Sequence, residues 1–517
     1  MTPPIDADLD SRGAILVPAP GAHVGYARIK TGVPGLDEIL NGGLPARGVY
    51  LLLGQPGTGK STISMQFLLE GARRGEKCLY LSMAESRGQL KVMADSFGWR
   101  LDGIDIHEVQ RHGRSVGGGD RAGYTVFNPA EAELEEIFRE VVEQIDKVRP
   151  SRLVLDSLSE IRMLAQDAAR YRRELLSLSE ALSGRPCTSW VIDMVPSASD
   201  INAAETIVNG VLLLEHLVPA YGGDRRRLHL RKLRASRSIG GHHDFAIQDN
   251  GVEVYPRLAP ASHRATHSSA TLSSGVGELD ALLGGGLDAG TSTLLVGAAG
   301  TGKSTVAAQF VAATAGRGER AAFLCFDESP TNLLIRTNRL GIPLAEQVRE
   351  GKVELMPVEA AEYTPGSLSH RIRRLVDEGA RVVVLDSVNG YLSALPDERF
   401  LSAHLHDLLA FLAERGAATI VTLAEHGLLG AAPASSLNIS SVADTVVLFR
   451  LFEEAGVVRR AISVVKKRTG KHERSIRELR FGPRGLEVGP PLTSMRDVLS
   501  GRPHVDPRAG GKADSDR

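Results

Sequence analysis

The chain has 517 residues, a length that favours two to four domains, each with its own buried core. Its 61 lysines and arginines balance 62 aspartates and glutamates, which excludes a global positive field that would hold the protein on nucleic acid. The three cysteines show no CxxC spacing, which excludes the usual disulfide framework and the usual zinc site.

The N-terminal segment, residues 1–27, is polar and acidic, unlike a signal peptide. No apolar run reaches the roughly 18 residues that a membrane helix needs. We therefore expect a soluble, cytoplasmic protein with no membrane partner.

A first domain is predicted over residues 28–256, where short apolar runs alternate with helical patterns. The predicted strands are 48–54, 77–83, 152–156, 188–195 and 210–217, and the clearest helix is 131–148. Strands that are apolar almost throughout are typical of a mainly parallel sheet with helices on both faces. The sequence therefore predicts an α/β fold.

The domain then recurs. A polar, basic linker at 257–270 precedes a second predicted domain over 271–488, and residues 489–517 read as a flexible Gly/Pro-rich tail. The segment "TGVPGLDEILNGGLPARGVYLLLGQPGTGKST" (31–62) matches "SGVGELDALLGGGLDAGTSTLLVGAAGTGKST" (274–305) at an offset of 243 residues. Two later motifs recur in the same order, so the chain is a tandem duplication.

Both copies carry a complete phosphate-binding loop, G-x-x-x-x-G-K-[ST], between an apolar strand and a helix. The candidate nucleotide-binding residues are Gly54, Gly57, Thr58, Gly59, Lys60, Ser61, Thr62, Gly297, Gly300, Thr301, Gly302, Lys303, Ser304 and Thr305. Lys60 and Lys303 would reach the β- and γ-phosphates. Ser61 and Ser304 would offer a hydroxyl to Mg²⁺, so the expected cofactors are ATP and Mg²⁺.

Acidic residues follow the apolar strands of each copy. Asp156 and Asp386 each end a strand before a serine, the usual position of an aspartate that supports the metal. Glu85 in the first copy, and Asp327 with Glu328 in the second, follow the next strand and could orient a nucleophile or accept its proton. Glu328 is also a candidate metal ligand. Each acid could instead cap a turn or face solvent.

A basic cluster ends each copy, with Lys232 and Arg234 in the first and Lys466 and Arg468 in the second. Such a cluster can be a solvated sheet edge. Alternatively, it can supply arginine fingers to the triphosphate of a neighbouring subunit.

With these motifs assembled, the chain resembles the KaiC family of circadian-clock ATPases and autokinases, within the RecA-like superfamily. The resemblance covers roughly residues 28–500 and rests on the doubled "GxxxLDxxLxGGL" with its P-loop, the doubled "LDS", "SFGW" (96–99) and "LNISSVADTVVLF" (437–449). It implies two stacked RecA-like rings in a homohexamer, with ATP between subunits. It also implies slow ATP hydrolysis in the first ring and phosphoryl transfer by the second to Ser440 and Ser441.

The sequence departs from that family at several points. Ser441 stands where the best-known members have threonine, Ala84 replaces one of two adjacent glutamates, and Asp327 replaces a glutamate in the second copy. The tail after Pro503 differs from the segment that recruits the clock's stimulating partner, so a KaiA-like partner is not expected. KaiB-like proteins or signalling histidine kinases are the candidate partners, in a circadian-type, signalling or stress role.

Two other functions remain open from sequence alone. One is a RecA-type, DNA-directed ATPase, a recombinase or helicase motor, although the balanced charge and the lack of a visible DNA-binding module argue against DNA. The other is a scaffold that binds ATP without turnover.

Overall fold

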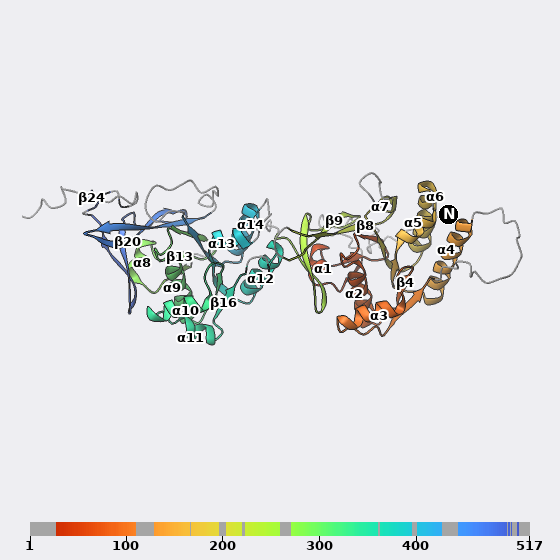
Figure 1. The fold of residues 1–517 in the computed structure, drawn as a ribbon, viewed down its shortest axis with the longest axis horizontal. Coiled ribbons are helices and arrows are strands. Elements are labelled where there is room, and N and C mark those ends of the chain that lie inside the picture. The colour runs from red at the N-terminus through yellow and green to blue at the C-terminus, as the bar shows by residue number, and fades with distance from the viewer. Residues whose placement is uncertain are drawn as a thin grey trace, which may run out of the picture. The chain divides into compact units, whose positions relative to one another are not determined.

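The computed structural model describes residues 27–109, 129–165, 167–195, 203–219, 223–258, 270–359, 362–394, 401–425, 443–493, 495–496, 498 and 504–505. The chain forms two compact units (Figure 1). Each is built on a nine-stranded sheet, and both sheets have the same strand order. The predicted α/β fold with two tandem, mainly parallel domains is confirmed.

The sheet of the first domain has the order β11-β10-β9-β8-β3-β7-β6-β4-β5. Its strands are β3 (Val49–Gly54), β4 (Cys78–Ser82), β5 (Ile104–Glu108), β6 (Arg152–Asp156), β7 (Thr188–Asp193), β8 (Gly210–Leu217), β9 (Arg225–Leu233), β10 (His242–Gln248) and β11 (Gly251–Tyr255). Strands β3 to β8 pair in parallel, whereas β9 and β10 pair antiparallel. The helices are α1 (Leu36–Ile39), α2 (Lys60–Arg73), α3 (Arg87–Ser96), α4 (Pro129–Val148), α5 (Leu158–Ala165), α6 (Ala168–Ser183) and α7 (Ala203–Ile207).

The second sheet repeats this order as β16-β15-β17-β18-β14-β19-β20-β21-β22. Its strands are β14 (Ser292–Gly297), β15 (Arg320–Cys325), β16 (Val353–Pro357), β17 (Ala380–Asp386), β18 (Ala418–Ala424), β19 (Thr445–Glu454), β20 (Val457–Lys467), β21 (Arg477–Gly482) and β22 (Gly485–Pro491). The helices are α8 (Gly277–Leu282), α9 (Lys303–Gly316), α10 (Pro330–Arg339), α11 (Leu344–Arg349), α12 (Pro365–Asp377), α13 (Val388–Ala394) and α14 (Leu401–Glu414). Short two-residue pairs complete the chain: β1 (Arg28–Ile29) with β2 (Leu44–Pro45), β12 (Thr271–Leu272) with β13 (Leu287–Asp288), and β23 (Met495–Arg496) with β24 (His504–Val505).

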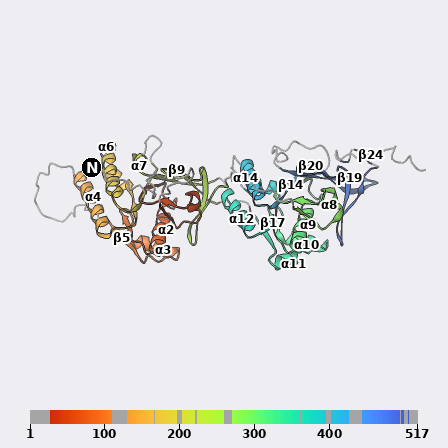
Figure 2. The same ribbon diagram turned by 180° about the vertical axis from the view of Figure 1, so that it is seen from behind.

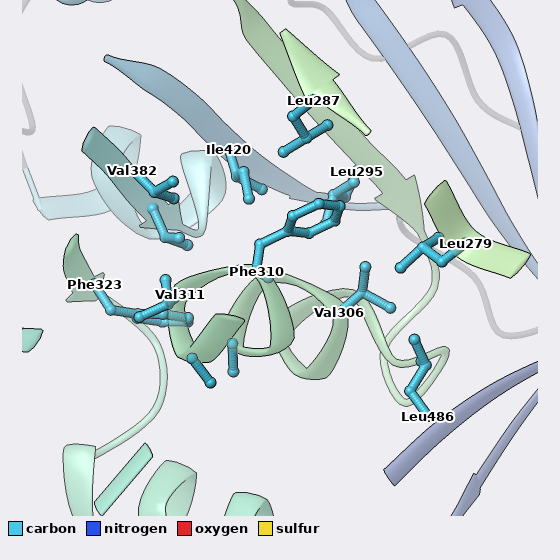
Figure 3. Packing of buried hydrophobic residues seen from close by; sticks show 14 of the residues in the cluster. Leu279, Leu287, Leu295, Val306, Phe310, Val311, Phe323, Val382, Ile420 and Leu486 are labelled. Atoms are coloured by element: carbon cyan, nitrogen blue, oxygen red, sulfur yellow. The ribbon is translucent and has the colours of Figure 1, made fainter. Parts of the chain in front are cut away.

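Helices cover both faces of the second sheet, as the continuous apolar strands predict. Residues of α8 to α11 form one core cluster with the sheet, and residues of α12 to α14 form another. Figure 2 labels α8 to α11, α12 and α14 beside this sheet. In the first cluster, the fully buried Phe310 of α9 lies among Leu295 and Val306 from the P-loop strand and helix (Figure 3). The strand and helix that flank the glycine loop are therefore held by a common core.

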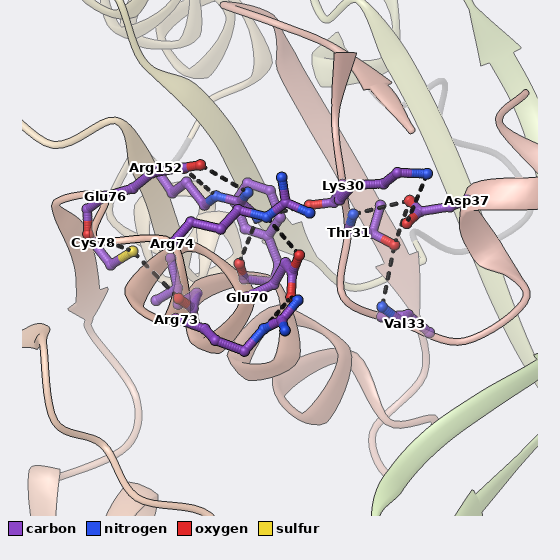
Figure 4. Close-up of polar contacts among 12 residues, drawn as sticks. Lys30, Thr31, Val33, Asp37, Glu70, Arg73, Arg74, Glu76, Cys78 and Arg152 are labelled. Carbon is purple, nitrogen blue, oxygen red and sulfur yellow. Dashed lines mark hydrogen bonds and ion pairs between the residues drawn. The ribbon is translucent and has the colours of Figure 1, made fainter. Parts of the chain in front are cut away.

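A buried arginine anchors the start of the first domain. Arg152 begins β6 and is fully buried, and its guanidinium donates to the Lys30 carbonyl at 2.7 Å and to the Phe67 carbonyl at 2.8 Å. It also forms an ion pair with Glu76 at 2.6 Å (Figure 4). One side chain thus connects the sheet, helix α2 and the segment before the repeated "LD" motif.

The repeated aspartate of that motif is structural. Asp37 accepts hydrogen bonds from the backbone N–H and the hydroxyl of Thr31, both at 2.9 Å. Asp280 accepts the equivalent pair of bonds from two residues, the hydroxyl of Ser273 and the backbone N–H of Ser274. The aspartate therefore closes the turn that leads into α1 or α8, and the Asp37 contacts are drawn in Figure 4.

Most predicted elements match to within two residues at their ends. The predicted helix 131–148 is α4, and the predicted strand 188–195 is β7, which ends earlier, at Asp193. Strand β22 continues to Pro491, past the predicted end of the domain at 488, because it pairs with β21 as far as Arg477. No helix in the described ranges is long and apolar enough to cross a bilayer.

Candidate nucleotide sites

The two glycine loops have the same backbone shape. Each connects the central strand of its sheet to a helix that begins at the motif lysine. Gly57 and Gly59 have φ angles of 78° and 94°, and Gly300 and Gly302 have 78° and 103°. These left-handed angles favour glycine, so the motif glycines allow the loop to turn its N–H groups towards an anion at the helix N-terminus.

The motif lysines lie across the loops. Lys60 Nζ donates to the carbonyls of Gly54 at 2.8 Å and Gln55 at 2.9 Å, and Lys303 Nζ makes the same pair of bonds, to Gly297 and Ala298. Burial lowers the pKa of both ammonium groups, and the nearby aspartates oppose this effect. Both lysines are therefore fixed at the mouth of the phosphate cradle.

In the first domain the candidate metal ligands lie close together. Ser61 Oγ lies 3.4 Å from Asp156 Oδ2, and the Tyr80 hydroxyl donates to the same oxygen at 2.6 Å. Burial raises the pKa of Asp156, while the Tyr80 hydrogen bond and the Lys60 charge oppose the rise. This serine–aspartate pair fits Mg²⁺ bound to ATP, because P-loop Mg²⁺ needs few protein ligands besides the phosphates.

The second domain supports its aspartate differently. The Thr422 hydroxyl of β18 donates to Asp386 Oδ1. Strand registers show that Phe323 occupies the position of Tyr80, and Ile192 that of Thr422. Each buried aspartate thus receives a hydroxyl from a neighbouring strand, which lies on one side of it in the first domain and on the other side in the second.

The acids that follow β4 and β15 also differ in their contacts. Burial, and then the Asp156 charge, raise the pKa of Glu85. Asp327 accepts a hydrogen bond from the Ser387 hydroxyl, and Glu328 accepts one from Arg336 Nη1 at 2.6 Å. Both carboxylates of the second domain are therefore held by neighbouring side chains.

These residues surround a cavity of about 430 Å³ in the second domain. Its walls include the P-loop and the acids Asp327, Glu328 and Asp386. Arg336, Arg460 and Phe481 also line the cavity. Phe481 packs against Gly302, where an added Cβ would lie 2.3 Å from the ring, and Arg460 stacks over the ring at 5.5 Å. The size suits a small ligand.

Lys466 and Arg468, the predicted basic cluster of the second domain, are not among the described residues that line this cavity. Lys232 Nζ donates to the Glu205 carbonyl at 2.7 Å, and Lys466 Nζ to the Ala443 carbonyl at 2.6 Å. Arg234 contacts the Thr206 carbonyl at 3.3 Å, and Arg468 forms an ion pair with Asp444 at 3.6 Å. Ser440 and Ser441 lie outside the described residues.

Sequence reasoning missed Tyr80, Thr422, Ser387 and Arg336. Tyr80 and Thr422 lie inside apolar strand runs, where a hydroxyl gives no signal until the neighbouring strand is known. Arg336 lies two helical turns beyond Glu328, and only the fold of α10 brings it back to the acid. Comparison of the two copies could have found the Tyr80–Phe323 difference.

The KaiC ATPase family profile matches residues 29–259 and again residues 272–493. The chain belongs to the KaiC family. It is 27% identical over 489 residues to the circadian clock protein KaiC3 of Synechocystis, covering 93% of this chain and 95% of that protein. It is 26% identical to the circadian clock oscillator protein KaiC of Synechococcus elongatus, with 93% and 92% covered. The family match indicates ATPase domains and does not favour the DNA-directed motor.

Proposed function

We propose that the first domain hydrolyses ATP and that the second transfers the γ-phosphate of ATP to Ser440 and Ser441, with the protein acting as a circadian-type, signalling or stress regulator in the cytoplasm. The observation that carries the proposal is the difference between the two acid positions. The second domain has adjacent carboxylates, Asp327 and Glu328, in the wall of its cavity, whereas the first has Ala84 and Glu85.

In the first domain, Lys60 and the loop N–H groups would hold the phosphates, and Ser61 with Asp156 would hold Mg²⁺. Mg²⁺ bound there would offset the charge of the β- and γ-phosphate oxygens. Glu85 would orient a water molecule, whose oxygen bonds to the γ-phosphorus as the bond to the β–γ bridging oxygen breaks and ADP leaves. The water proton passes to the carboxylate or to the phosphate.

In the second domain the nucleophile would be a serine hydroxyl. Its oxygen bonds to the γ-phosphorus, ADP leaves with the bridging oxygen, and the hydroxyl proton passes to Asp327 or Glu328. Alignment supplies most of the rate of such a transfer, which favours a site with fixed carboxylates. The assembly we propose is a homohexamer in which Lys232, Arg234, Lys466 and Arg468 act on the ATP of a neighbouring chain.

Intact mass after incubation with Mg·ATP tests the proposal. We expect a gain of about 80 Da per phosphate, absent when both Ser440 and Ser441 are replaced by alanine, while ATP hydrolysis in the first domain continues. Phosphate at other residues only, or no gain in the wild type, would rule out transfer to this pair. Hydrolysis that rises on addition of DNA would instead favour the motor.

A further inference from the structure

Arg336 contacts the acid of the second nucleotide site from within the same chain. It lies in the wall of the cavity, and its Nη1 forms an ion pair with Glu328 Oε1 at 2.6 Å. Glu328 immediately precedes Ser329, the N-cap of α10, and Arg336 lies on that helix. Helical side chains lean towards the N-terminus, so a long arginine can reach back over two turns to the acid.

The remaining donors of Arg336 are enclosed. Its Nε and Nη2 are buried, and neither has a hydrogen-bond partner among the residues that the structure describes. The ion pair with Glu328 is therefore the main polar contact that fixes this guanidinium.

The first domain carries a neutral side chain at the same place. At the offset of 243 residues that relates Glu85 to Glu328, Arg336 corresponds to Met93, which is half-buried on α3. The two nucleotide sites thus differ in the partner of the acid as well as in the number of acids.

We propose that Arg336 is a positioning residue that restrains Glu328 and so suppresses ATP hydrolysis in the second domain. The lone pair of Oε1 that accepts from Arg336 is unavailable to a water nucleophile, and the carboxylate is fixed in one orientation. Asp327, held by Ser387, stays available to receive a serine proton. The inference rests on the proposed function of the second domain, since slow hydrolysis conserves ATP for transfer.

The test replaces Arg336 with the residue of the first domain. In a Lys60→Ala background, where only the second site turns over, Arg336→Met should raise kcat for ATP hydrolysis about fivefold, the effect of releasing a partly exposed ion pair, with KM unchanged. Arg336→Lys should keep hydrolysis close to the parent level. The reciprocal change, Met93→Arg in a Lys303→Ala background, should lower hydrolysis in the first domain.

A double-mutant comparison isolates the contact. Adding Arg336→Met to Glu328→Gln should change nothing further, because the restrained group is already gone. If Arg336→Met raised KM without raising kcat, the proposal would be overturned, because Arg336 would then act by binding the triphosphate of ATP. A fall in kcat, or the same gain in the Glu328→Gln background, would also overturn it.

The outcome is separable from that of the proposed function. If Arg336→Met raises hydrolysis while the wild type incorporates no phosphate, the restraint stands and serine transfer fails. If phosphate is incorporated and hydrolysis does not respond, transfer stands and the restraint fails. The thermal unfolding temperature of the Arg336→Met variant checks that it folds. Methionine is the residue that the first domain carries at this position, as Met93.

Discussion

At the scale of single residues, the two sites differ in the side chain that donates a hydrogen bond to the buried aspartate. A buried aspartate beside the metal position needs a donor to stay ionised and oriented, and residues behind a metal ligand commonly tune metal affinity. Tyr80 supplies the hydroxyl for Asp156, and Thr422 supplies it for Asp386. The donor comes from a different flanking strand in each domain, and the equivalent position on the other strand carries Ile192 or Phe323.

We predict that Tyr80→Phe weakens Mg·ATP binding at the first site about tenfold, because Asp156 loses its shortest hydrogen bond. Adding Ile192→Thr, which copies the second domain, should restore much of the affinity. Nucleotide titration in a Lys303→Ala background measures both. Tyr50→Phe is the control, since it removes a buried hydroxyl that, within the described residues, bonds the Pro45 carbonyl. Equal loss in the control would mean a general effect on the domain.

The raised pKa of Glu85 predicts a pH dependence. Burial and the Asp156 charge disfavour its ionised form, so the carboxylate is lost at a higher pH than the usual 4.5 of a glutamate. Because our proposal has the ionised form orient the attacking water, hydrolysis by the first domain should fall as pH decreases through that raised pKa. A rate profile of Lys303→Ala between about pH 5 and pH 8 would show it. The same acidic limb in Glu85→Gln would assign it to another group.

At the scale of helices and strands, the sequence predicted the central strands of the sheet but not the strands towards its edges. Apolar runs such as 48–54 identify buried parallel strands because both faces are covered, and the motif glycines fix the loop that follows. The antiparallel strands β9 to β11 carry mixed, charged patterns, so none of the three was predicted. The side-chain partners of the acids depend on strand order, which no local pattern encodes.

Replacing Arg152 tests how much its buried contacts between these elements stabilise the first domain. Arg152→Met should lower the stability of the first domain by roughly 3 kcal/mol, because it leaves two buried carbonyls and Glu76 without their donor. The only two tryptophans, Trp99 and Trp190, are in this domain, so urea unfolding followed by tryptophan fluorescence reports on it alone. Arg73→Met, at a guanidinium with 74% of its side chain exposed, should change stability little. Comparable losses would mean that burial is not the cause.

At the scale of the whole molecule, duplication gives one chain two unequal nucleotide sites. The sheets share one strand order and the loops share one shape, while the acid partners, the hydroxyl donors and the Arg336 contact differ. Lys466 and Arg468 are not among the described residues that line the cavity of the second domain, and Lys232 and Lys466 donate to backbone carbonyls of their own domains. Our proposal has these clusters act on the ATP of a neighbouring subunit.

We therefore predict particles of six chains at saturating Mg·ATP, measured by mass photometry. Arg468→Ala should lower turnover at the second site at least about tenfold while nucleotide binding is retained, because an arginine finger acts on transition-state charge. Arg484→Ala, at an arginine whose side chain is 91% exposed, is the matched control. A monomer in saturating nucleotide would exclude fingers supplied by a neighbour.

The strand order also has a consequence during synthesis. Val49 and Tyr50 of the first P-loop strand pair with Ser189 and Gly210, about 140 and 160 residues later in the chain. At a translation rate of roughly 5–20 residues per second, about 7 to 30 s pass between synthesis of the apolar stretch "VYLLLG" and synthesis of the strands that pair with it. Unpaired apolar strands aggregate, so the yield of folded protein should depend strongly on growth temperature and on chaperones that act at the ribosome.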